Sequence, residues 1–313
     1  MTSQPQPAGR TARAGRASTV VGALLGTVCV GFVVRELATE WDRVGDAVAD
    51  AQVGWIAAGL VLAVAAMAAI AWSWADALAA LGARVGRRRV MAWYFLGELG
   101  KYLPGGVWPV LGRGELARRG GVARTTAYAS VVLSLLTLYL GALLVAATLA
   151  PIDRAGDGSV SAALALLVLL PLGLALLHHR VLDGVLGWVR RVTGRSVTIA
   201  VPRWTTVVGL VLRYVPAWAC VGVSTWCVAR AVSPDAPLVR IALAAVLSWL
   251  AGFVAVPVPA GAGVREAVFI AVAGLPGAIA ATVAVTARVL FIVADAAGAA
   301  LAGASVSRRP KEG

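Results

Sequence analysis

Long apolar stretches separated by short polar ones dominate the chain. A bilayer crossing needs roughly 17–25 mostly apolar residues, and backbone polar groups in hydrocarbon must be satisfied within the segment, so these stretches are predicted to be transmembrane helices. The stretches are residues 18–34, 55–75, 125–149, 160–177 and 205–229, followed by a long apolar region at 241–305. We therefore predict an all-α, polytopic helical bundle of about eight membrane elements.

A further apolar segment, residues 90–112, is predicted to be re-entrant. Arginines flank it on both sides, and a single crossing would place one basic cluster outside, against the positive-inside rule. Its first limb, Met91 to Leu103, is too short to span the bilayer at about 1.5 Å per residue, and the sequence Pro-Gly-Gly at 104–106 breaks it. Irregular backbone at membrane depth needs protein or a wet cavity around it, which predicts a cavity beside residues 98–113.

A second break in the sequence echoes this one. The sequence L-P-G-G-V-W-P-V-L-G-R-G-E runs from Leu103 to Glu115, and V-P-V-P-A-G-A-G-V-R-E runs from Val256 to Glu266. In each, a Pro/Gly break is followed by an arginine and a glutamate. Broken helices at matching positions in two halves of a membrane protein point to a transport site.

The echo predicts an internal repeat with halves at 18–204 and 205–305. If the 205–229 helix runs outward, the second break is entered from the outside and is inverted relative to the first. A second topology stays open, in which 241–256 is a full span and two tight spans fill 266–305. Charge counting does not separate the two, because both leave the C-terminal tail on the same side.

Composition supports the membrane assignment and excludes a soluble enzyme. Of 313 residues, 60% are hydrophobic and 14% are charged, whereas a soluble domain carries about 25% charged residues. The formal net charge is nevertheless +13. Membrane proteins concentrate Lys and Arg in their cytoplasmic loops, so this charge orients the helices and does not require nucleic acid as a partner.

The distribution of charge predicts the orientation in the cell membrane. The basic segments 1–17, 76–90 and 178–204 are placed in the cytoplasm, and the acidic or sparsely charged loops 35–54 and 150–159 outside. Residues 1–17 are expected to be a disordered tail, 18–305 the single membrane domain and 306–313 a basic cytoplasmic tail. Both termini are then cytoplasmic.

At K-Y-L-P-G-G-V-W, Lys101 to Trp108, followed by G-R-G-E and later by P-V-P-A-G-A-G-V-R-E, the chain resembles the lysylphosphatidylglycerol synthase transmembrane, or flippase-like, family. The resemblance covers about residues 18–305. It implies a lipid translocase of the cell envelope that handles an anionic phospholipid or a polyprenyl-phosphate-linked precursor. Bifunctional members also carry a soluble aminoacyltransferase domain, which we expect this chain to lack, so lysyl transfer is not inherited and no enzymatic activity is predicted.

Four basic residues are the candidates for binding a lipid phosphate: Lys101, Arg113, Arg265 and Arg288. An arginine can hold a phosphate with two parallel hydrogen bonds, and a lysine acts as a point charge. Positive-inside anchoring is the competing interpretation for Arg113 and Arg265. A charge at the bilayer centre costs about 2.5–3.5 kcal/mol on insertion scales, so such residues pair, face water or have a function.

Other residues are expected to support this site. Glu98 lies three residues before Lys101 on one helical face, and Asp295 shares a face with Arg288, so that both can line one cavity. Backbone N–H groups near the glycines can add anion binding. The supporting set is Glu98, Pro104, Gly105, Gly106, Glu115, Pro259, Gly261, Gly263, Glu266 and Asp295. No metal site and no cofactor are predicted, since the chain has only two histidines.

Two other functions stay open. The acidic residues Glu40, Asp42, Asp46 and Asp50 invite comparison with polyprenyl-phosphate-dependent glycosyltransferases, although an amphipathic helix with its acids facing water also explains them. The third function is a scaffold for an envelope-lipid synthase. Membrane lipids are the expected partners, and a homodimer or envelope-synthesis enzymes are the candidate protein partners.

Overall fold

The computed structural model describes residues 52–103, 107–153, 202–254, 261 and 263–307, which form eight α-helices and one 3-10 helix and contain no strand. Four of the helices have 28, 30, 29 and 31 residues: α2 (Val53–Ala80), α5 (Arg124–Asp153), α8 (Trp204–Val232) and α11 (Gly277–Ser307). All four are long and apolar enough to cross a membrane. The prediction of an all-α polytopic membrane protein is confirmed.

The other helices are short and pair into two hairpins. They are α3 (Arg87–Glu98), the 3-10 helix η1 (Leu99–Tyr102), α4 (Trp108–Arg119), α9 (Leu238–Val254) and α10 (Val264–Val272). With 12, 12, 17 and 9 residues, α3, α4, α9 and α10 fall short of the roughly 20 residues that a full crossing needs. We call α3, η1 and α4 the first hairpin, and α9 and α10 the second hairpin.

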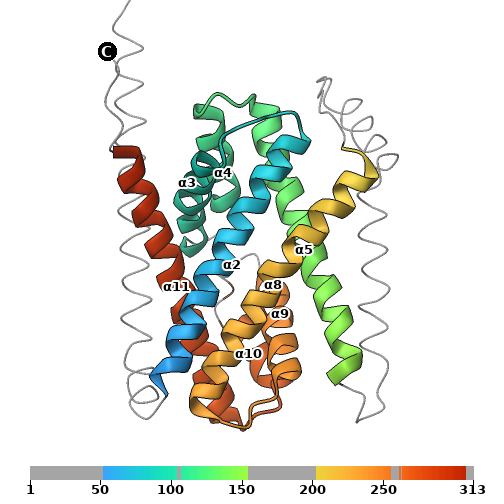
Figure 1. The fold of residues 1–313 in the computed structure, drawn as a ribbon, viewed down its shortest axis with the longest axis vertical. Coiled ribbons are helices and arrows are strands. Elements are labelled where there is room, and N and C mark those ends of the chain that lie inside the picture. The colour runs from blue at the N-terminus through green and yellow to red at the C-terminus, as the bar shows by residue number, and fades with distance from the viewer. Residues whose placement is uncertain (1–51, 104–106, 154–201, 255–260, 262, 308–313) are drawn as a thin grey trace, which may run out of the picture.

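The two hairpins enter the bundle from opposite ends, as Figure 1 shows. The first begins and ends at the end where α2 stops and α5 begins; the second begins and ends where α8 stops and α11 begins. This is the inverted arrangement of the first predicted topology. The second topology required two tight spans within 266–305, but the short α10 is followed there by the single long helix α11.

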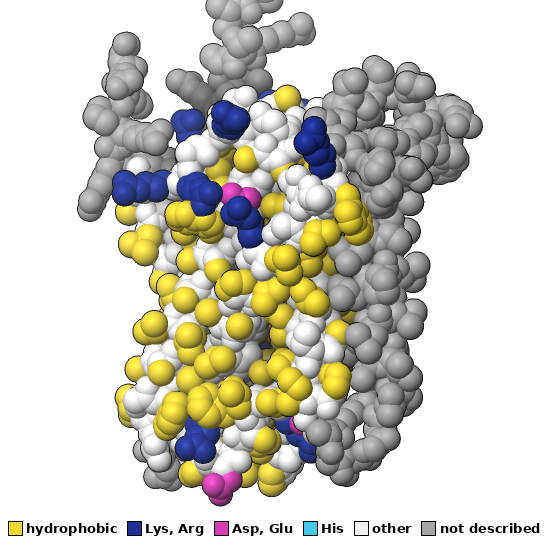
Figure 2. All heavy atoms as spheres, turned by 45° about the vertical axis from the view of Figure 1, so that its right-hand side comes forward, with side chains coloured by type: hydrophobic (Ala, Val, Ile, Leu, Met, Phe, Trp, Pro, Cys, Tyr) yellow, Lys and Arg dark blue, Asp and Glu magenta, His cyan; other side chains and the backbone are white. Residues whose placement is uncertain are grey.

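Arginines gather at one end of the molecule, which we call the arginine-rich end. Figure 2 shows blue side chains around this end, a wide band of yellow apolar side chains below it, and a smaller charged group at the opposite end. Exposed apolar residues of the long helices include Val61 and Trp72 on α2, Val132 on α5 and Leu212 on α8. A band of this kind is expected where a helical bundle contacts lipid.

Close packing joins the long helices. α2 and α8 run antiparallel, because the N–H of Gln52 at the start of α2 donates to the carbonyl of Ala231 near the end of α8 (3.3 Å). Where they cross, Ser224 Oγ donates to the carbonyl of Gly59 (2.7 Å), and a Cβ at Gly59 would lie 3.1 Å from Leu290 Cδ2. In lipid the hydrophobic effect does not drive helices together, and small residues at such crossings stabilise their association by allowing close packing.

Two buried tryptophans between these helices have hydrogen-bond partners on α5. Trp74 Nε1 donates to Ser130 Oγ (3.1 Å), and Trp218 Nε1 donates to the carbonyl of Leu138 (2.8 Å). An unpaired polar group in such a core costs about 1–3 kcal/mol, so these bonds fix the contacts of α5 with α2 and α8.

Some predicted boundaries were too short. The helix expected over 55–75 continues to Ala80, and the first limb of the hairpin begins at Arg87 instead of Met91. The basic segment was predicted to begin at residue 76, but Asp76 lies within α2, where Arg87 (3.0 Å) and Arg213 (2.5 Å) pair with it. Predictions for residues 1–51, 154–201 and 308–313 lie outside the described residues.

Candidate functional site

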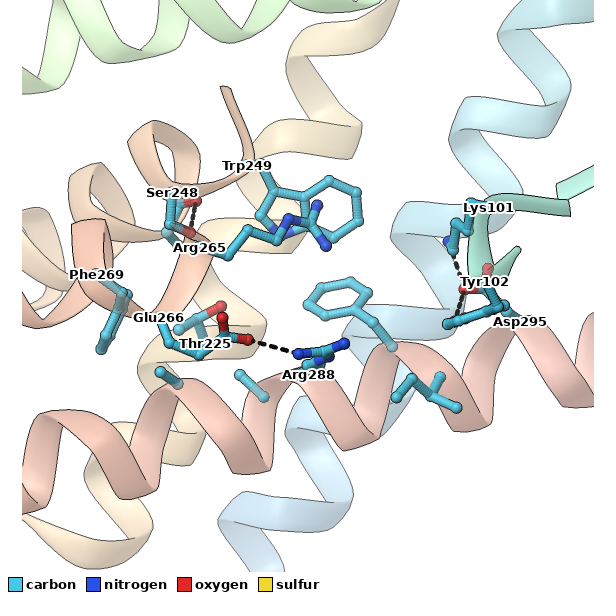
Figure 3. A pocket seen from close by; sticks show the side chains of 15 residues that line it. Lys101, Tyr102, Thr225, Ser248, Trp249, Arg265, Glu266, Phe269, Arg288 and Asp295 are labelled. Atoms are coloured by element: carbon cyan, nitrogen blue, oxygen red, sulfur yellow. Dashed lines mark hydrogen bonds and ion pairs between the residues drawn. The ribbon is translucent and has the colours of Figure 1, made fainter. Parts of the chain in front are cut away.

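A cavity lies between the two hairpins and α11. Figure 3 shows the charged and aromatic side chains around it. The polar and aromatic lining is Lys101 and Tyr102 from η1, Thr225 from α8, Ser248 and Trp249 from α9, Arg265, Glu266 and Phe269 from α10, and Arg288, Phe291 and Asp295 from α11. The cavity volume is about 50 Å³, room for a few water molecules.

The cavity has two charged sides. Lys101, Tyr102 and Asp295 lie on one side in Figure 3, and the side chains of α10 lie on the other. The ring of Trp249 lies between these sides in Figure 3. It packs edge to face on the ring of Phe291, with the centroids 5.1 Å apart. The sequence predicted a cavity beside residues 98–113, and the described cavity reaches this segment at Lys101 and Tyr102.

On the first side, Asp295 holds the tip of the first hairpin to α11. Its Oδ2 atom is 2.5 Å from Lys101 Nζ and accepts a hydrogen bond from the hydroxyl of Tyr102 (2.8 Å). Asp295 is completely buried, with an exposed fraction of 0%. Its Oδ1 atom has no hydrogen-bond partner in the described part of the chain.

The predicted phosphate ligand Arg113 lies away from the cavity lining. It is 2% exposed, its Nε donates to the carbonyl of Pro109 (3.3 Å), and the same atom lies 3.9 Å from Glu98 Oε2. The guanidinium carbon is 5.2 Å from the ring centroid of Tyr94. Glu98 also approaches Lys101 (3.6 Å), as the three-residue spacing predicted.

On the second side, Glu266 connects the start of α10 to α11. One carboxylate oxygen lies 3.0 Å from Arg288 Nη1, and the other accepts a hydrogen bond from the backbone N–H of Gly263 (2.5 Å). The sequence predicted that the backbone N–H near Gly263 can add anion binding. Instead, Glu266 occupies that amide and pairs with Arg288.

Arg265 differs from the other basic residues of the cavity. Its guanidinium carbon lies 3.8 Å from the ring centroid of Trp249, a cation–π contact, and its side chain packs on Gly252. It forms no ion pair with any carboxylate of the described residues. The second hairpin therefore presents to the cavity a cation that makes no ion pair with any carboxylate of the described residues.

The remaining predicted residues are at the edge of this site or beyond it. Glu115 pairs with Arg118 (2.7 Å) and Arg119 (2.9 Å) at the arginine-rich end, and hydrogen bonds from both lower the pKa of Glu115 to about 2. Gly261 adopts φ +68°, and a Cβ there would lie 2.6 Å from the Cα of Gly252. Pro104, Gly105, Gly106 and Pro259 lie outside the described residues.

The charges that line the cavity do not cancel. The basic lining residues are Lys101, Arg265 and Arg288, and the acidic ones are Glu266 and Asp295. Among the described residues that line the cavity, three positive and two negative groups leave one surplus positive charge. In an apolar bundle this surplus favours an anionic occupant over a neutral one.

Comparison with known protein families identifies the family to which this chain belongs. The sequence matches the family described as "Lysylphosphatidylglycerol synthase TM region" over residues 19–299. The chain belongs to this family. The lysylphosphatidylglycerol synthase TM region covers both hairpins and the whole cavity lining, so the site lies within the family's membrane domain. The family description places the chain among membrane proteins of lipid metabolism. No curated protein matches the sequence.

The sequence analysis did not predict three residues of the site in this member of the lysylphosphatidylglycerol synthase TM family. Tyr102 was passed over although it adjoins Lys101, and Trp249 and Gly252 were read as part of an apolar run. The sequence does contain a pattern that indicates Trp249 and Gly252. In each hairpin an aromatic residue precedes a glycine by three positions, Trp249 before Gly252 and Tyr94 before Gly97. Both aromatic residues stack on an arginine of the opposite limb.

Proposed function

We propose that the chain binds the headgroup of an anionic lipid at the cavity and carries it between the leaflets of the cell membrane. The observation that carries this proposal is Arg265, a cation at the cavity with no ion pair to the described carboxylates. A guanidinium can give two parallel hydrogen bonds to a phosphate, and Trp249 holds its plane in place from one side. Arg288 and Lys101 add positive charge nearby.

The physical task of such a protein is to lower the cost of moving a charged headgroup through hydrocarbon. An isolated ion in a low-dielectric medium loses its hydration, and pairing with a fixed opposite charge replaces part of it. The cavity supplies one surplus positive charge, the charge that a single phosphodiester neutralises. A phospholipid or a polyprenyl phosphate derivative meets this description.

The inverted hairpins suit alternating access to one central site. In transporters built from inverted repeats, broken helices meet near the membrane midplane and the halves rock around a fixed binding site. Here η1 and α10 reach the same cavity from opposite ends of the bundle. By the positive-inside rule, the arginine-rich end faces the cytoplasm.

The described cavity is too small for a headgroup, so binding requires the hairpins to move apart. Only a few water molecules fit in about 50 Å³. The cavity is bounded by η1 and α10, each at the inner end of a hairpin, and movement of either would enlarge it without unfolding a long helix. We therefore assign the described conformation to a closed state.

Reconstitution tests the proposal directly. Purified protein in vesicles containing a fluorescent anionic phospholipid, or a polyprenyl phosphate, should accelerate movement of the label between leaflets. Arg265→Gln should lower that rate by at least about tenfold, because two charge-assisted hydrogen bonds are lost. Arg118→Gln is the matched control, since Arg118 pairs with Glu115 on the surface and lies away from the cavity.

Two results would count against a lipid translocase. Wild-type vesicles that accelerate neither lipid would contradict it outright. Loss of function on replacing Glu40, Asp42 and Asp46 with Ala, with Arg265→Gln unaffected, would favour a glycosyltransferase, whose chemistry needs carboxylates that a flippase does not.

A further inference from the structure

Asp295 is a buried carboxylate whose two oxygens have different surroundings. Oδ2 is held by Lys101 (2.5 Å) and by the hydroxyl of Tyr102 (2.8 Å). Oδ1 is buried and has no hydrogen-bond partner in the part of the chain that the structure describes. A buried carboxylate oxygen without a donor is costly, and a proton bound to it removes that cost.

The groups that face Asp295 come from several packed elements. Lys101 and Tyr102 from η1 contact it, Glu98 from α3 lies on the other side of Lys101, and the second side of the cavity holds Arg265, Glu266 and Arg288. The charged residues of α2 and α8 within their described lengths are Asp76, Arg213 and Arg230, and none of these lines the cavity. Asp295 and Glu98 thus share one lysine, and Glu98 Oε2 also lacks a hydrogen-bond partner among the described residues.

We propose that Asp295 is a proton-binding site coupled to the headgroup site, an inference that rests on the proposed binding of an anionic lipid at Arg265. A proton from cavity water binds Oδ1 of Asp295 when the headgroup enters, and returns to water when the headgroup leaves. No other bond forms or breaks, and Lys101 and Tyr102 stay on Oδ2.

Charge gives the coupling its sign. The cavity groups carry one surplus positive charge when Asp295 is ionised, and two when it is protonated. Protonation therefore favours anion binding, and by linkage a bound anion favours protonation to the same extent. A proton and a headgroup with one negative charge then cross together as a neutral pair, so transport becomes independent of the membrane potential.

The geometry favours a proton over a metal cation at this position. The Lys101 ammonium already lies between Glu98 and Asp295 and would repel a second cation. No group of three His, Cys, Asp or Glu side chains among the described residues is placed to hold a metal ion. A proton, in contrast, needs only the single open oxygen.

A pH gradient across proteoliposomes tests the coupling. With the wild type, a labelled anionic phospholipid should accumulate in the leaflet on the alkaline side, whichever way the protein is inserted, and an imposed potential should not redistribute it. Asp295→Asn imitates the protonated state, so the label should distribute equally under a pH gradient and should follow an imposed potential. Headgroup affinity should rise by about tenfold in this variant.

Infrared spectroscopy tests the proton site without lipid. Difference spectra between acidic and neutral samples of the purified protein should contain the carbonyl stretch of a protonated carboxylic acid. The component of this band that comes from Asp295 should be missing in Asp295→Asn and shifted in Asp295→Glu, whereas the contribution of the other carboxyl groups stays the same. Asp153→Asn serves as the matched control in both experiments, because Asp153 pairs with Arg240 (3.1 Å) outside the cavity.

The outcomes separate this inference from the proposed function. Accumulation that persists in Asp295→Asn, equal distribution in the wild type, a dependence on sodium instead of pH, or an acid band identical in the wild type and Asp295→Asn would each overturn the proton site and leave lipid movement standing. Wild-type vesicles that move no lipid would remove the proposed function, and the infrared band would then still decide whether Asp295 binds a proton.

Discussion

The two hairpins use the same packing device around arginines with different surroundings. In the first, Gly97 packs against Arg113, whose guanidinium lies 5.2 Å from the ring of Tyr94. In the second, Gly252 packs against Arg265, whose guanidinium lies 3.8 Å from the ring of Trp249. In both hairpins, a glycine on the first limb gives room for an arginine on the second.

The surroundings of the two arginines differ at one position of the hairpin, the residue after the packing glycine. The residue after Gly97 is Glu98, which lies 3.9 Å from Arg113, whereas the residue after Gly252 is Phe253, which stacks on Tyr139 (3.8 Å between centroids). Arg113 is therefore close to an acid and excluded from the cavity lining, and Arg265 is at the cavity without one. The comparison teaches that two hairpins with the same packing device leave their arginines in different electrostatic surroundings when one of them lacks the neutralising acid.

The largest expected effect is a difference in stability between the two arginines. Arg113→Gln should lower the free energy of unfolding by about 3 kcal/mol, because breaking a buried pair leaves Glu98 poorly compensated. Arg265→Gln should leave stability unchanged or raise it, since it removes a buried cation without an acidic partner. Thermal unfolding in detergent measures both. Equal destabilisation by the two changes would break the comparison.

Moving the acid to the second hairpin should inactivate the site. Phe253→Glu places a carboxylate at the position that corresponds to Glu98, where it can pair with Arg265 and compete with a lipid phosphate. We expect lipid movement to fall by about tenfold, the effect of about 1.4 kcal/mol. Phe253→Gln is the control for loss of the Tyr139 contact, and it should retain most of the activity. Similar losses in both variants would show that packing, not charge, is responsible.

Replacing Gly97 or Gly252 with Ala should have smaller effects, on stability in the first case and on lipid movement in the second. A Cβ at Gly97 would lie 2.8 Å from the backbone nitrogen of Arg113, whereas the three atoms nearest to a Cβ at Gly252 are side-chain atoms of Arg265, the closest at 2.5 Å. Gly97→Ala should therefore cost about 1–3 kcal/mol of stability. Gly252→Ala should cost less and should displace Arg265 from Trp249, lowering lipid movement instead. Unfolding and translocation assays on both variants distinguish these effects.

The smallest expected effects are on stability, when Glu266 and Glu115, the glutamates that follow the two Pro/Gly breaks, are replaced by Gln. Glu266→Gln loses the pair with Arg288 and weakens the cap at Gly263, so we expect a loss of about 1 kcal/mol. Glu115→Gln should change stability by less than about 0.5 kcal/mol, because exposed pairs contribute little. The pKa of Glu115, about 2, lies below its usual value, so its small contribution is present near neutral pH and disappears as pH falls toward 2. Thermal unfolding over a pH series checks both.

Much of the fold was predictable because membrane insertion makes strong demands on local sequence. Long apolar stretches became helices, and the Pro/Gly breaks after Lys101 and before Arg265 ended short limbs, since hydrocarbon tolerates no unsatisfied backbone. The flanking arginines indicated the re-entrant character of the first hairpin. Boundaries such as Ala80 were missed because the distant partner of Asp76, Arg213, is not visible to a local pattern.

The sequence by itself determined the class of the protein, its helices and the short set of basic residues from which the site is drawn. Only the tertiary structure decided how those residues are used. It brought Tyr102 to Asp295 across 193 positions, separated Arg113 from the cavity and left Arg265 at it. The physical reason is that hydrophobic period and length act within one helix, whereas neutralisation of a charge depends on which helices pack together and at what depth.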